Sequence, residues 1–493
     1  MSSEVATSPM LHNLAVVMPE IVLLSAICVV LVLDLFLSKE QRIWTHIASL
    51  LALLLTAAWV WTGMPEQAQS VFSGSFVRDP LSDLLKLFVL LSVGLGLVYA
   101  RTTLAPRGMY RGEFYLLALF GTLGMLVLIS AHNLLTLYLG LELMSLSMYA
   151  LVALQRDSAR ASEAAMKYFV LGALASGFFL YGASMLYGLS GSLQLREVAA
   201  AVVAAQEGDR LFAVFGLVFV LVGMAFKLGA VPFHMWVPDV YQGSPTAVTL
   251  YLSSAPKLAA FALILRVLTE GLGSLHFDWQ QMLMVLAVLS MGLGNLVAIA
   301  QTNLKRMLAY SGISHAGFLL LGLLSGTQEG YGSALFYVVI YALTSAAAFG
   351  LILIYSRAGF EAENLEDWKG VGKQSPLLAL MMLIVMFSMA GVPPTVGFYA
   401  KLSVLQAVVG IDLLGLAIIA VVFAVIGAFY YLRVIKFMFF DPPAAGDEEV
   451  MGEGVLARAP DATALMSLNT LALLVLGLMP GPLMSWCLSV FAV

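Results

Sequence analysis

The sequence predicts an all-α, polytopic membrane protein, on the evidence of its composition and of the length of its apolar runs. Of its 493 residues, 61% are hydrophobic and only 11% are charged, and the mean hydropathy is +0.96. Soluble domains have about half apolar and about a quarter charged residues, so this chain holds more apolar surface than a soluble core can bury. Its apolar runs are about 20 residues long, the length of a helix that crosses a bilayer.

One crossing per apolar run gives about fourteen transmembrane helices. The first run contains Glu20 and Asp34 and has no basic segment before it, which indicates a retained span rather than a cleaved signal peptide. The expected ranges are 14–37, 43–62, 81–100, 113–131, 133–154, 164–189, 211–242, 246–269, 279–300, 304–325, 331–356, 376–411, 413–440 and 462–490.

The seventh and twelfth ranges are too long for one simple crossing, and each holds proline near its middle. Pro232 lies within 211–242, and Pro393 and Pro394 lie within 376–411. Proline removes a backbone donor and clashes with the preceding turn, so we expect both helices to be discontinuous. Transporters place their ion sites at such breaks.

The basic residues are distributed unevenly between the two sets of loops. An even number of helices puts both termini on one side, and cytoplasmic loops carry the excess of Lys and Arg. We therefore expect both termini in the periplasm. The cytoplasmic set is then Lys39, Arg42, Arg101, Arg107, Arg111, Arg156, Arg160, Lys305, Arg306, Arg357, Lys369, Lys373, Arg433, Lys436 and Arg458, against Arg78, Arg196 and Arg210 outside.

Three sequence matches indicate an internal repeat. Residues 168–176 match 337–345 at an offset of 169, residues 226–232 match 387–393 at 161, and Asn133-Leu134 matches Asn303-Leu304 at 170. The period is five helices, an odd number, so the two copies must cross the membrane in opposite senses, as in many ion-coupled transporters. The predicted organisation is three N-terminal helices (1–112), a first repeat (113–270), an inverted second repeat (279–440) and a loop with the last helix (441–493).

Four charged residues fall at similar depth inside predicted helices: Glu142, Lys227, Lys257 and Lys401. Charge in hydrocarbon is costly, so such residues are functional candidates by default. A desolvated ammonium loses its proton more readily, and a nearby carboxylate holds the proton on. Pairing or separating Glu142 and Lys227 could therefore switch proton affinity. The alternative is a static ion pair that fixes helix packing.

Three further residues are candidate proton relays. His234 directly follows the seventh-helix break, and His315 lies within the tenth helix; a satisfied packing histidine is the alternative at each position. Lys305 opens the tenth helix, where it could line a channel mouth. Snorkelling or solvation at helix ends explains the charges of Asp34, Lys86, Asp239 and Arg266.

The sequence lacks the motifs of an enzyme that acts alone. It contains no phosphate-binding loop and no dinucleotide fingerprint, and its two cysteines, Cys28 and Cys487, suggest neither a disulfide framework nor a metal or iron–sulfur site. Energy for transport must come from an ion gradient or from other subunits. We expect lipid and protein partners, and no nucleic acid.

Long runs of this sequence resemble the antiporter-like, proton-translocating membrane subunits of respiratory complex I, the bacterial NADH-quinone oxidoreductase. The runs are 227–245, 303–311 with His315, and 391–401. The resemblance covers nearly the whole chain, and the subunit N type fits best, because Lys401 stands where the M type has glutamate and the long lateral helix of the L type is missing.

This resemblance implies a translocase subunit in a bacterial inner membrane, with NADH, FMN, iron–sulfur clusters and quinone handled by partner subunits and no redox centre in this chain. It implies that Glu142 and Lys227 form a switching ion pair, that Lys257 is a central relay and that Lys401 serves the second half-channel, with His234 and His315 assisting. Neighbouring antiporter-like subunits would be partners. The alternatives are a subunit of a multi-subunit sodium/proton antiporter, a subunit of a hydrogenase-type membrane complex, and a membrane scaffold without transport.

Overall fold

The computed structural model describes residues 9–357, 360–442, 456 and 459–492. Within these residues, thirteen helices are long and apolar enough to cross a membrane. Two shorter apolar helices, Pro376–Ala390 and Val396–Val409, occupy the range where one further long helix was expected. The prediction of a polytopic, all-α membrane protein is therefore confirmed. The expected loop after residue 440, with Arg458, lies mostly outside the described residues.

The described helices follow one another along the chain with short connections. They are α1 (Pro9–Val16), α2 (Met18–Phe36), η1 (Lys39–Gln41), α3 (Ile43–Thr62), α4 (Pro80–Leu104), α5 (Gly112–Ser130), α6 (Leu134–Val152), α7 (Ala159–Ser190), α8 (Leu195–Ala204), α9 (Glu207–Leu228), α10 (Trp236–Gly243), α11 (Thr246–Ser253), α12 (Ala255–Arg266), η2 (Val267–Gly271), η3 (Gly273–Leu275), α13 (His276–Ile299), α14 (Leu304–Leu324), α15 (Gln328–Tyr355), η4 (Leu365–Trp368), α16 (Val371–Gln374), α17 (Pro376–Ala390), α18 (Val396–Val409), α19 (Leu414–Phe439), α21 (Pro460–Leu478) and α22 (Gly481–Ser489).

A hairpin of two short strands interrupts the helical pattern between α3 and α4. Strand β1 (Gln69–Val71) pairs antiparallel with β2 (Phe76–Arg78), with Ser70 opposite Val77. This hairpin was not predicted from the sequence, because three-residue strands are too short to give an alternating pattern.

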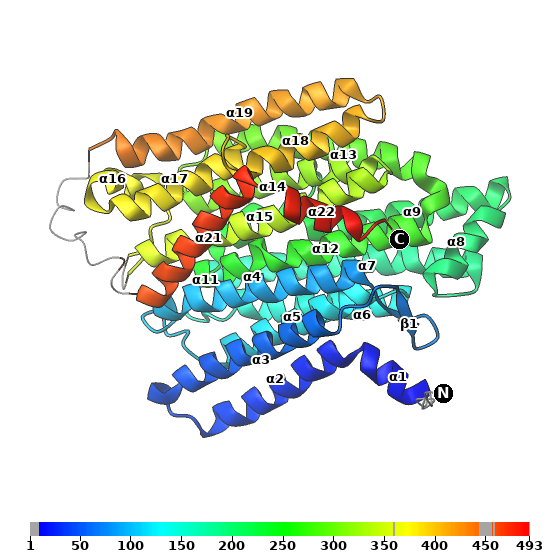
Figure 1. Ribbon diagram of the computed structural model, residues 1–493, viewed down its shortest axis with the longest axis horizontal. Coiled ribbons are helices and arrows are strands. Elements are labelled where there is room, and N and C mark those ends of the chain that lie inside the picture. Colours follow the sequence, from blue (N-terminus) through cyan, green and yellow to red (C-terminus); the bar gives the residue numbers. More distant parts are fainter. Residues whose placement is uncertain (1–8, 358–359, 443–455, 457–458, 493) are drawn as a thin grey trace, which may run out of the picture.

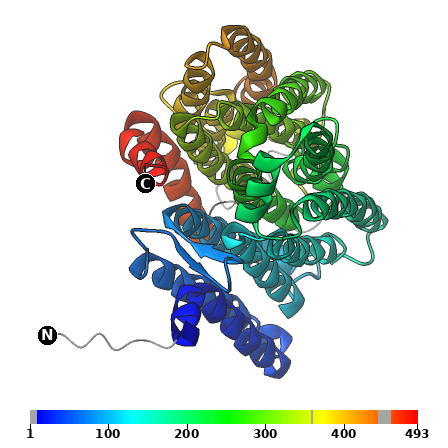
Figure 2. The ribbon, with the colours of Figure 1, turned by 90° about the vertical axis from the view of Figure 1, so that its right-hand side faces the viewer.

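The long helices run roughly side by side, with α1, the hairpin and α8 toward one end and α16 toward the other (Figure 1). Seen along many of the helices, the N-terminal helices form one edge and α19 the opposite edge (Figure 2). The spans Thr246–Gly271 and Gln328–Tyr355 are fully buried in their most apolar windows, whereas Met18–Phe36 is mostly exposed. The core therefore lies along α11, α12 and α15, and the outer helices present apolar side chains outward, as lipid contact requires.

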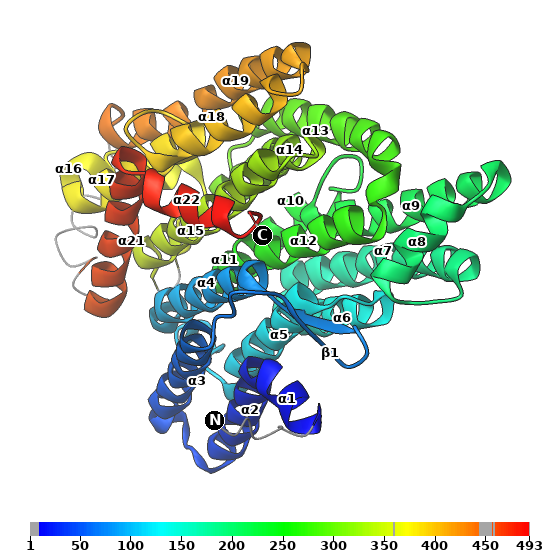
Figure 3. The ribbon, with the colours of Figure 1, turned by 45° about the vertical axis from the view of Figure 1, so that its right-hand side comes forward.

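Several predicted helices are interrupted in the structure. The expected range 211–242 contains α9 and α10, with α10 set between neighbouring helices (Figure 3). Gly229, with φ +78°, ends α9, and Gly391, with φ +83°, ends α17. Glycine adopts this left-handed conformation without the steric cost that a β-carbon adds.

Two ranges expected to form one continuous helix each are divided in the structure, although the first still lies within one candidate span, Thr246–Gly271. The eighth range divides at Ser254, whose φ of −108° and ψ of −88° are not helical, just before Pro256 in the first turn of α12. The last range divides between α21 and α22 at Met479 and Pro480. In both places a proline that cannot donate a backbone hydrogen bond opens or precedes the second piece.

Candidate functional site

Lys227, in the last turn of α9, is buried and bonded to hydroxyl groups of α6. Its Nζ atom lies 2.8 Å from Ser145 Oγ and 3.4 Å from Tyr149 Oη. Glu142, one turn before Ser145 on the same helix, instead accepts a hydrogen bond from Ser176 Oγ of α7. The structure thus brings Glu142 and Lys227 to one polar cluster, although no carboxylate among the described residues lies within ion-pair distance of Lys227.

Aromatic rings surround this cluster. The Lys227 ammonium lies 5.8 Å from the ring centres of Tyr149 and Phe226. Tyr168 of α7 meets Tyr149 edge-on at 4.6 Å and stacks on Trp236 at 4.5 Å. These rings exclude bulk water from the ammonium and offer it their negative faces.

Lys257, on α12, reaches the break that follows α9. Its side chain is 4% exposed, and its Nζ atom donates a 2.7 Å hydrogen bond to the carbonyl oxygen of Leu228. The ammonium also lies 5.7 Å from the Trp236 ring centre. Because Leu228 follows Lys227 directly, the two lysines lie at the same break.

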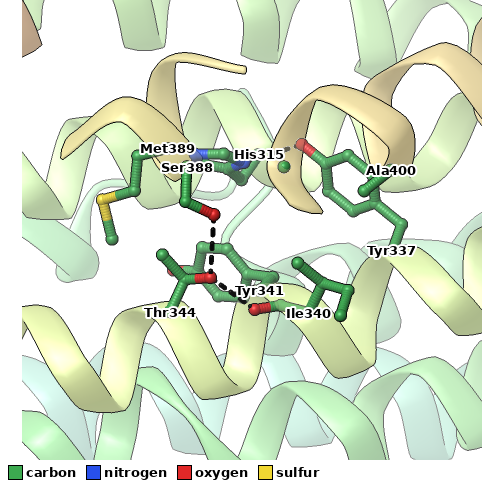
Figure 4. A pocket seen from close by; sticks show the side chains of 9 residues that line it. His315, Tyr337, Ile340, Tyr341, Thr344, Ser388, Met389 and Ala400 are labelled. Atoms are coloured by element: carbon green, nitrogen blue, oxygen red, sulfur yellow. Dashed lines mark hydrogen bonds between the residues drawn. The ribbon is translucent and has the colours of Figure 1, made fainter. Parts of the chain in front are cut away.

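A cavity opens beside Lys257 and leads toward α14. It is narrow and is lined by Lys257, Leu228, His315, Tyr337 and Tyr341, among others. A second narrow cavity shares His315, Tyr337 and Tyr341 with the first, and extends to Ser388 and Met389 of α17 and Ala400 of α18 (Figure 4). Both cavities have polar groups in their walls, and each has space for about one water molecule.

His315 lies where the two cavities meet. Its Nδ1 atom is 2.7 Å from the hydroxyl of Tyr337 on α15, and its Nε2 atom is 3.2 Å from the hydroxyl of Tyr431 on α19. Thr344 and Ser388 add hydroxyl groups 3.5 Å apart on the far side of the second cavity (Figure 4). Each imidazole nitrogen therefore has a hydroxyl partner, an arrangement in which a histidine can receive and release a proton.

Lys401, on α18, occupies the second break much as Lys257 occupies the first. Its Nζ atom donates to the carbonyl oxygens of Met389 at 3.0 Å and of Ala390 at 2.9 Å, at the end of α17. The ammonium lies 5.1 Å from the Phe318 ring centre. Met389 and Ala400, next to Lys401 in sequence or bonded to it, also line the second cavity with His315, although Lys401 itself is not part of the lining.

The two other predicted relay residues lie apart from this series. His234 is half-buried in the first break, and no hydrogen bond between described residues joins it to the lysines. Lys305, only 1% exposed, donates to the carbonyl oxygen of Ser244 at 2.7 Å and lies 3.6 Å from Glu361 and 3.9 Å from Glu363. It therefore belongs to an ionic cluster at the ends of the helices.

Two charges that the sequence analysis explained by snorkelling are fully enclosed instead. Lys86 is completely buried and pairs with Glu20 at 2.8 Å. Arg266, 1% exposed, donates to Asp79 and Glu270 at 2.9 and 2.8 Å. Pairing with carboxylates makes this burial tolerable. The acidic Glu20 in the first apolar run was the available signal for the first pair, but its partner is far away in the sequence.

Comparison with known proteins identifies the family to which this chain belongs. The family model described as NADH:quinone oxidoreductase/Mrp antiporter, transmembrane, matches residues 131–427, so the chain belongs to that family. A chain of the Mrp complex from Dietzia sp. DQ12-45-1b has a TM-score of 0.83 over 98% of this chain and 97% of its own, and at 23% identity this likeness concerns the fold alone.

More similar relatives place the chain within one branch of the family. Subunit N of NADH-quinone oxidoreductase from Thioalkalivibrio sulfidiphilus is 55% identical over 469 residues, 95% of this chain and 96% of the relative. A chain of respiratory complex I from Thermus thermophilus is 33% identical with a TM-score of 0.78, over 95% of this chain and 98% of its own. The chain is therefore a member of the NADH-quinone oxidoreductase subunit N family.

Proposed function

We propose that this chain moves protons across a bacterial inner membrane as part of complex I, through Glu142, Lys227, Lys257, His315 and Lys401. Electron transfer from NADH to quinone takes place in partner subunits, which carry FMN and iron–sulfur clusters. The observation that carries the proposal is the pair of adjoining cavities that runs from Lys257 past His315 to Met389, whose carbonyl oxygen accepts from Lys401.

In the first half, the Lys227 ammonium exchanges its proton with groups at the break. Ser145 accepts from Lys227, while Glu142 is held by Ser176. When the Glu142 carboxylate moves toward Lys227, Coulomb attraction in this low-dielectric setting holds the proton on the ammonium; when it moves away, desolvation favours release. The facing Lys257 takes up a released proton across the break.

In the second half, His315 passes the proton onward. A proton from Lys257 enters the first cavity, reaches one imidazole nitrogen and leaves from the other side toward Lys401. Tyr337 and Tyr431 hold the ring in place through its two nitrogens. The carbonyl oxygens of Met389 and Ala390 steady the Lys401 ammonium without neutralising it, so Lys401 remains able to release its proton. Lys305 and His234 have supporting roles outside this series.

The inverted repeat is part of the proposal, with the first unit at 113–270 and the second at 279–440. A pair of matching backbone contacts supports this repeat. Asn133 forms an isolated bridge with Gln194, and Asn303 forms one with Asn364, at a common offset of 170 residues. Each of the two asparagines also caps the helix that follows, α6 or α14, through its side-chain oxygen.

The break after α9 and the break after α17 also correspond. We take them as the midpoints of discontinuous seventh and twelfth transmembrane helices. Gly229 and Gly391 share a left-handed conformation, and the carbonyls of Leu228 and Ala390 each accept from a lysine, all at an offset of 162. This offset differs by one from the 161 expected from the sequence match. Half-helix ends expose carbonyl groups that no helix partner satisfies, and lysines fill that role here.

We propose that both termini face the periplasm. The strongly basic segments, such as 101–111 and 156–160, lie in connections at the end of the molecule opposite the hairpin and α8. Cytoplasmic loops carry such an excess of basic residues. The outer edges of the molecule would contact lipid and neighbouring antiporter-like subunits, with 1–112 and 441–493 flanking the two repeats.

The competing function is that of a subunit in a sodium/proton antiporter, which shares the fold. To separate the two, the tagged chain is purified in mild detergent from its own host and assayed for flavin, iron–sulfur absorbance and NADH–quinone activity. Co-purification of these centres with activity is the expected result. A preparation that contains only membrane subunits, without redox centres, would overturn the complex I assignment in favour of the antiporter.

A further inference from the structure

A basic pocket, distinct from the series of proton-transfer groups, lies between the α2–α3 turn and the α4–α5 loop. Its charged lining consists of Lys39, Arg42, Arg111 and Glu113, with Tyr110 beside them. Its volume is about 460 Å³. Three cations and one carboxylate thus meet at the ends of two outer helices.

The cations of this pocket are not neutralised by the protein. Among the described residues, no ion pair is formed by Lys39, Arg42 or Arg111. The Nε and Nη1 atoms of Arg42 are buried, yet neither has a hydrogen-bond partner. Arg42 is only partly buried as a residue, but buried donor atoms without a partner are costly, so these two call for an acceptor that the described residues do not supply.

The surroundings of the pocket indicate the source of that acceptor. Leu35 and Phe36, at the end of α2, are 76% and 81% exposed, and Trp44, in the first turn of α3, is 57% exposed. Phe36 stands three residues before Lys39, and Trp44 stands two residues after Arg42. Exposed apolar residues and tryptophan beside cations are characteristic of the boundary between hydrocarbon and headgroups.

We propose that this pocket binds the phosphate group of an anionic phospholipid. The Arg42 guanidinium donates to the phosphate oxygens, Lys39 and Arg111 add attraction from the rim, and the acyl chains lie along the exposed apolar faces of α2 and α3. Arg42 is the central ligand, because a planar guanidinium matches two phosphate oxygens at once. The site does not depend on the proton-transfer proposal, because its residues lie outside that series.

The test is lipid retention by the purified complex that contains this chain. After delipidation in detergent, short-chain phosphatidylglycerol is added back and bound lipid is measured by native mass spectrometry. The triple variant Lys39→Gln, Arg42→Gln, Arg111→Gln should bind phosphatidylglycerol at least about tenfold more weakly than the wild type, because each basic residue contributes separately to headgroup attraction. Arg156→Gln, an exposed arginine outside the pocket, is the matched control and should leave binding unchanged.

The other arms of the experiment identify the occupant. Phosphatidylcholine should not replace phosphatidylglycerol, and inorganic phosphate should compete only weakly, because it lacks acyl chains. Equal binding of phosphatidylglycerol by the wild type and the triple variant would overturn the proposal. Equal binding of inorganic phosphate and lipid would reduce the pocket to a general anion site. Cross-linking of Arg42 to an acidic segment of another subunit, without lipid, would replace the lipid by a protein partner.

Discussion

Lys257 and Lys401 differ from Lys86 in the groups that hold their ammonium nitrogens. Both are bonded to backbone carbonyls, whereas the Lys86 ammonium pairs with the Glu20 carboxylate. A lysine held by neutral acceptors can release its proton without leaving a buried carboxylate unpaired. This difference favours Lys257 and Lys401 over Lys86 as proposed proton carriers.

The Tyr337 hydroxyl should be required for rapid proton transfer past His315. Tyr337→Phe removes the partner of His315 Nδ1 and leaves the ring volume unchanged. We expect NADH-driven proton pumping in proteoliposomes to fall roughly tenfold or more, in keeping with the loss of a positioned proton-transfer group. Tyr99→Phe is the control, since Tyr99 is equally buried but bonds to Asn469 outside the series. Equal losses in both variants would point to a packing effect.

Ser145 should set the resting position of the Lys227 proton. Ser145→Ala removes the closest acceptor of the Lys227 ammonium, at 2.8 Å. We expect coupled turnover to fall severalfold, with a shifted pH profile, because the ammonium keeps only Tyr149 as a partner. Ser147→Ala, two residues along the same helix, removes a hydroxyl bonded only to the carbonyl of Leu143. A pH profile that moves equally in both variants would exclude a specific role for Ser145.

The break between α17 and α18 should depend on glycine at position 391. A β-carbon there would lie 2.9 Å from Lys401 Cδ, at a φ of +83° that other residues adopt at a cost of about 1–2 kcal/mol. Gly391→Ala should therefore lower the thermal stability of the chain and displace Lys401, with a loss of pumping. Gly177→Ala, at a helix position with no atom within 4 Å of the added carbon, should be neutral or stabilising. Normal pumping by an assembled Gly391→Ala complex would contradict this account of the break.

The segment between α15 and η4 joins several elements through Glu361. Its carboxylate accepts from Thr246 of α11 and lies 3.6 Å from both Lys305 of α14 and Arg107 of the α4–α5 loop. Burial alone would raise the pKa of Glu361, but these positive charges and the hydrogen bond outweigh burial and lower the pKa to about 2. Because the folded pKa lies below the ordinary value of 4.5, Glu361 contributes stability that is complete above about pH 4.5 and is lost as the pH falls toward 2.

Glu361→Gln should accordingly lower the melting temperature of the purified complex by a few degrees at pH 6. The difference from the wild type should shrink as the pH is lowered below about 4.5. Glu366→Gln, an exposed carboxylate paired with Lys369 three residues along, should change little at either pH. A difference that stays constant across this pH range would show that the charge of Glu361 is not what stabilises the segment.

Of the interruptions between the described helices, those after α9 and after α17 have a local signal in the sequence. The prolines at 232, 393 and 394 lie inside overlong apolar runs, so both breaks could be inferred. The break at Ser254 was missed because 246–269 has the ordinary length of one crossing. The partners of buried charges, such as Glu20 with Lys86 and His315 with Tyr431, come from helices far apart in the sequence, and only tertiary structure reveals them.

At the scale of the whole molecule, the fold by itself does not indicate what drives transport. The structural similarity to the Mrp complex is as high as that to complex I, with TM-scores of 0.83 and 0.78. The sequence identity of 55% to subunit N relatives is what separates the two. A shared fold with different partners is expected when transport resides in buried side chains and energy arrives from other subunits.

Lys86 provides a control within the same chain for the proposed role of Lys257 in proton transfer. Lys257 and Lys86 are both buried in the same chain, but of the two only Lys257 borders the cavity that also reaches His315. Lys257→Met removes a candidate carrier. The double variant Glu20→Gln, Lys86→Met removes both charges of a buried ion pair, which avoids leaving one charge unpaired.

The most direct test is NADH-driven proton pumping by the assembled complex in proteoliposomes, with Lys257→Met compared with the Glu20→Gln, Lys86→Met double variant. We predict that Lys257→Met assembles but loses most of its pumping, by roughly tenfold or more, while the double variant pumps at close to the wild-type rate. Normal pumping by assembled Lys257→Met, or an equal loss in both variants, would contradict proton transfer along the series from Lys257 past His315 to Lys401.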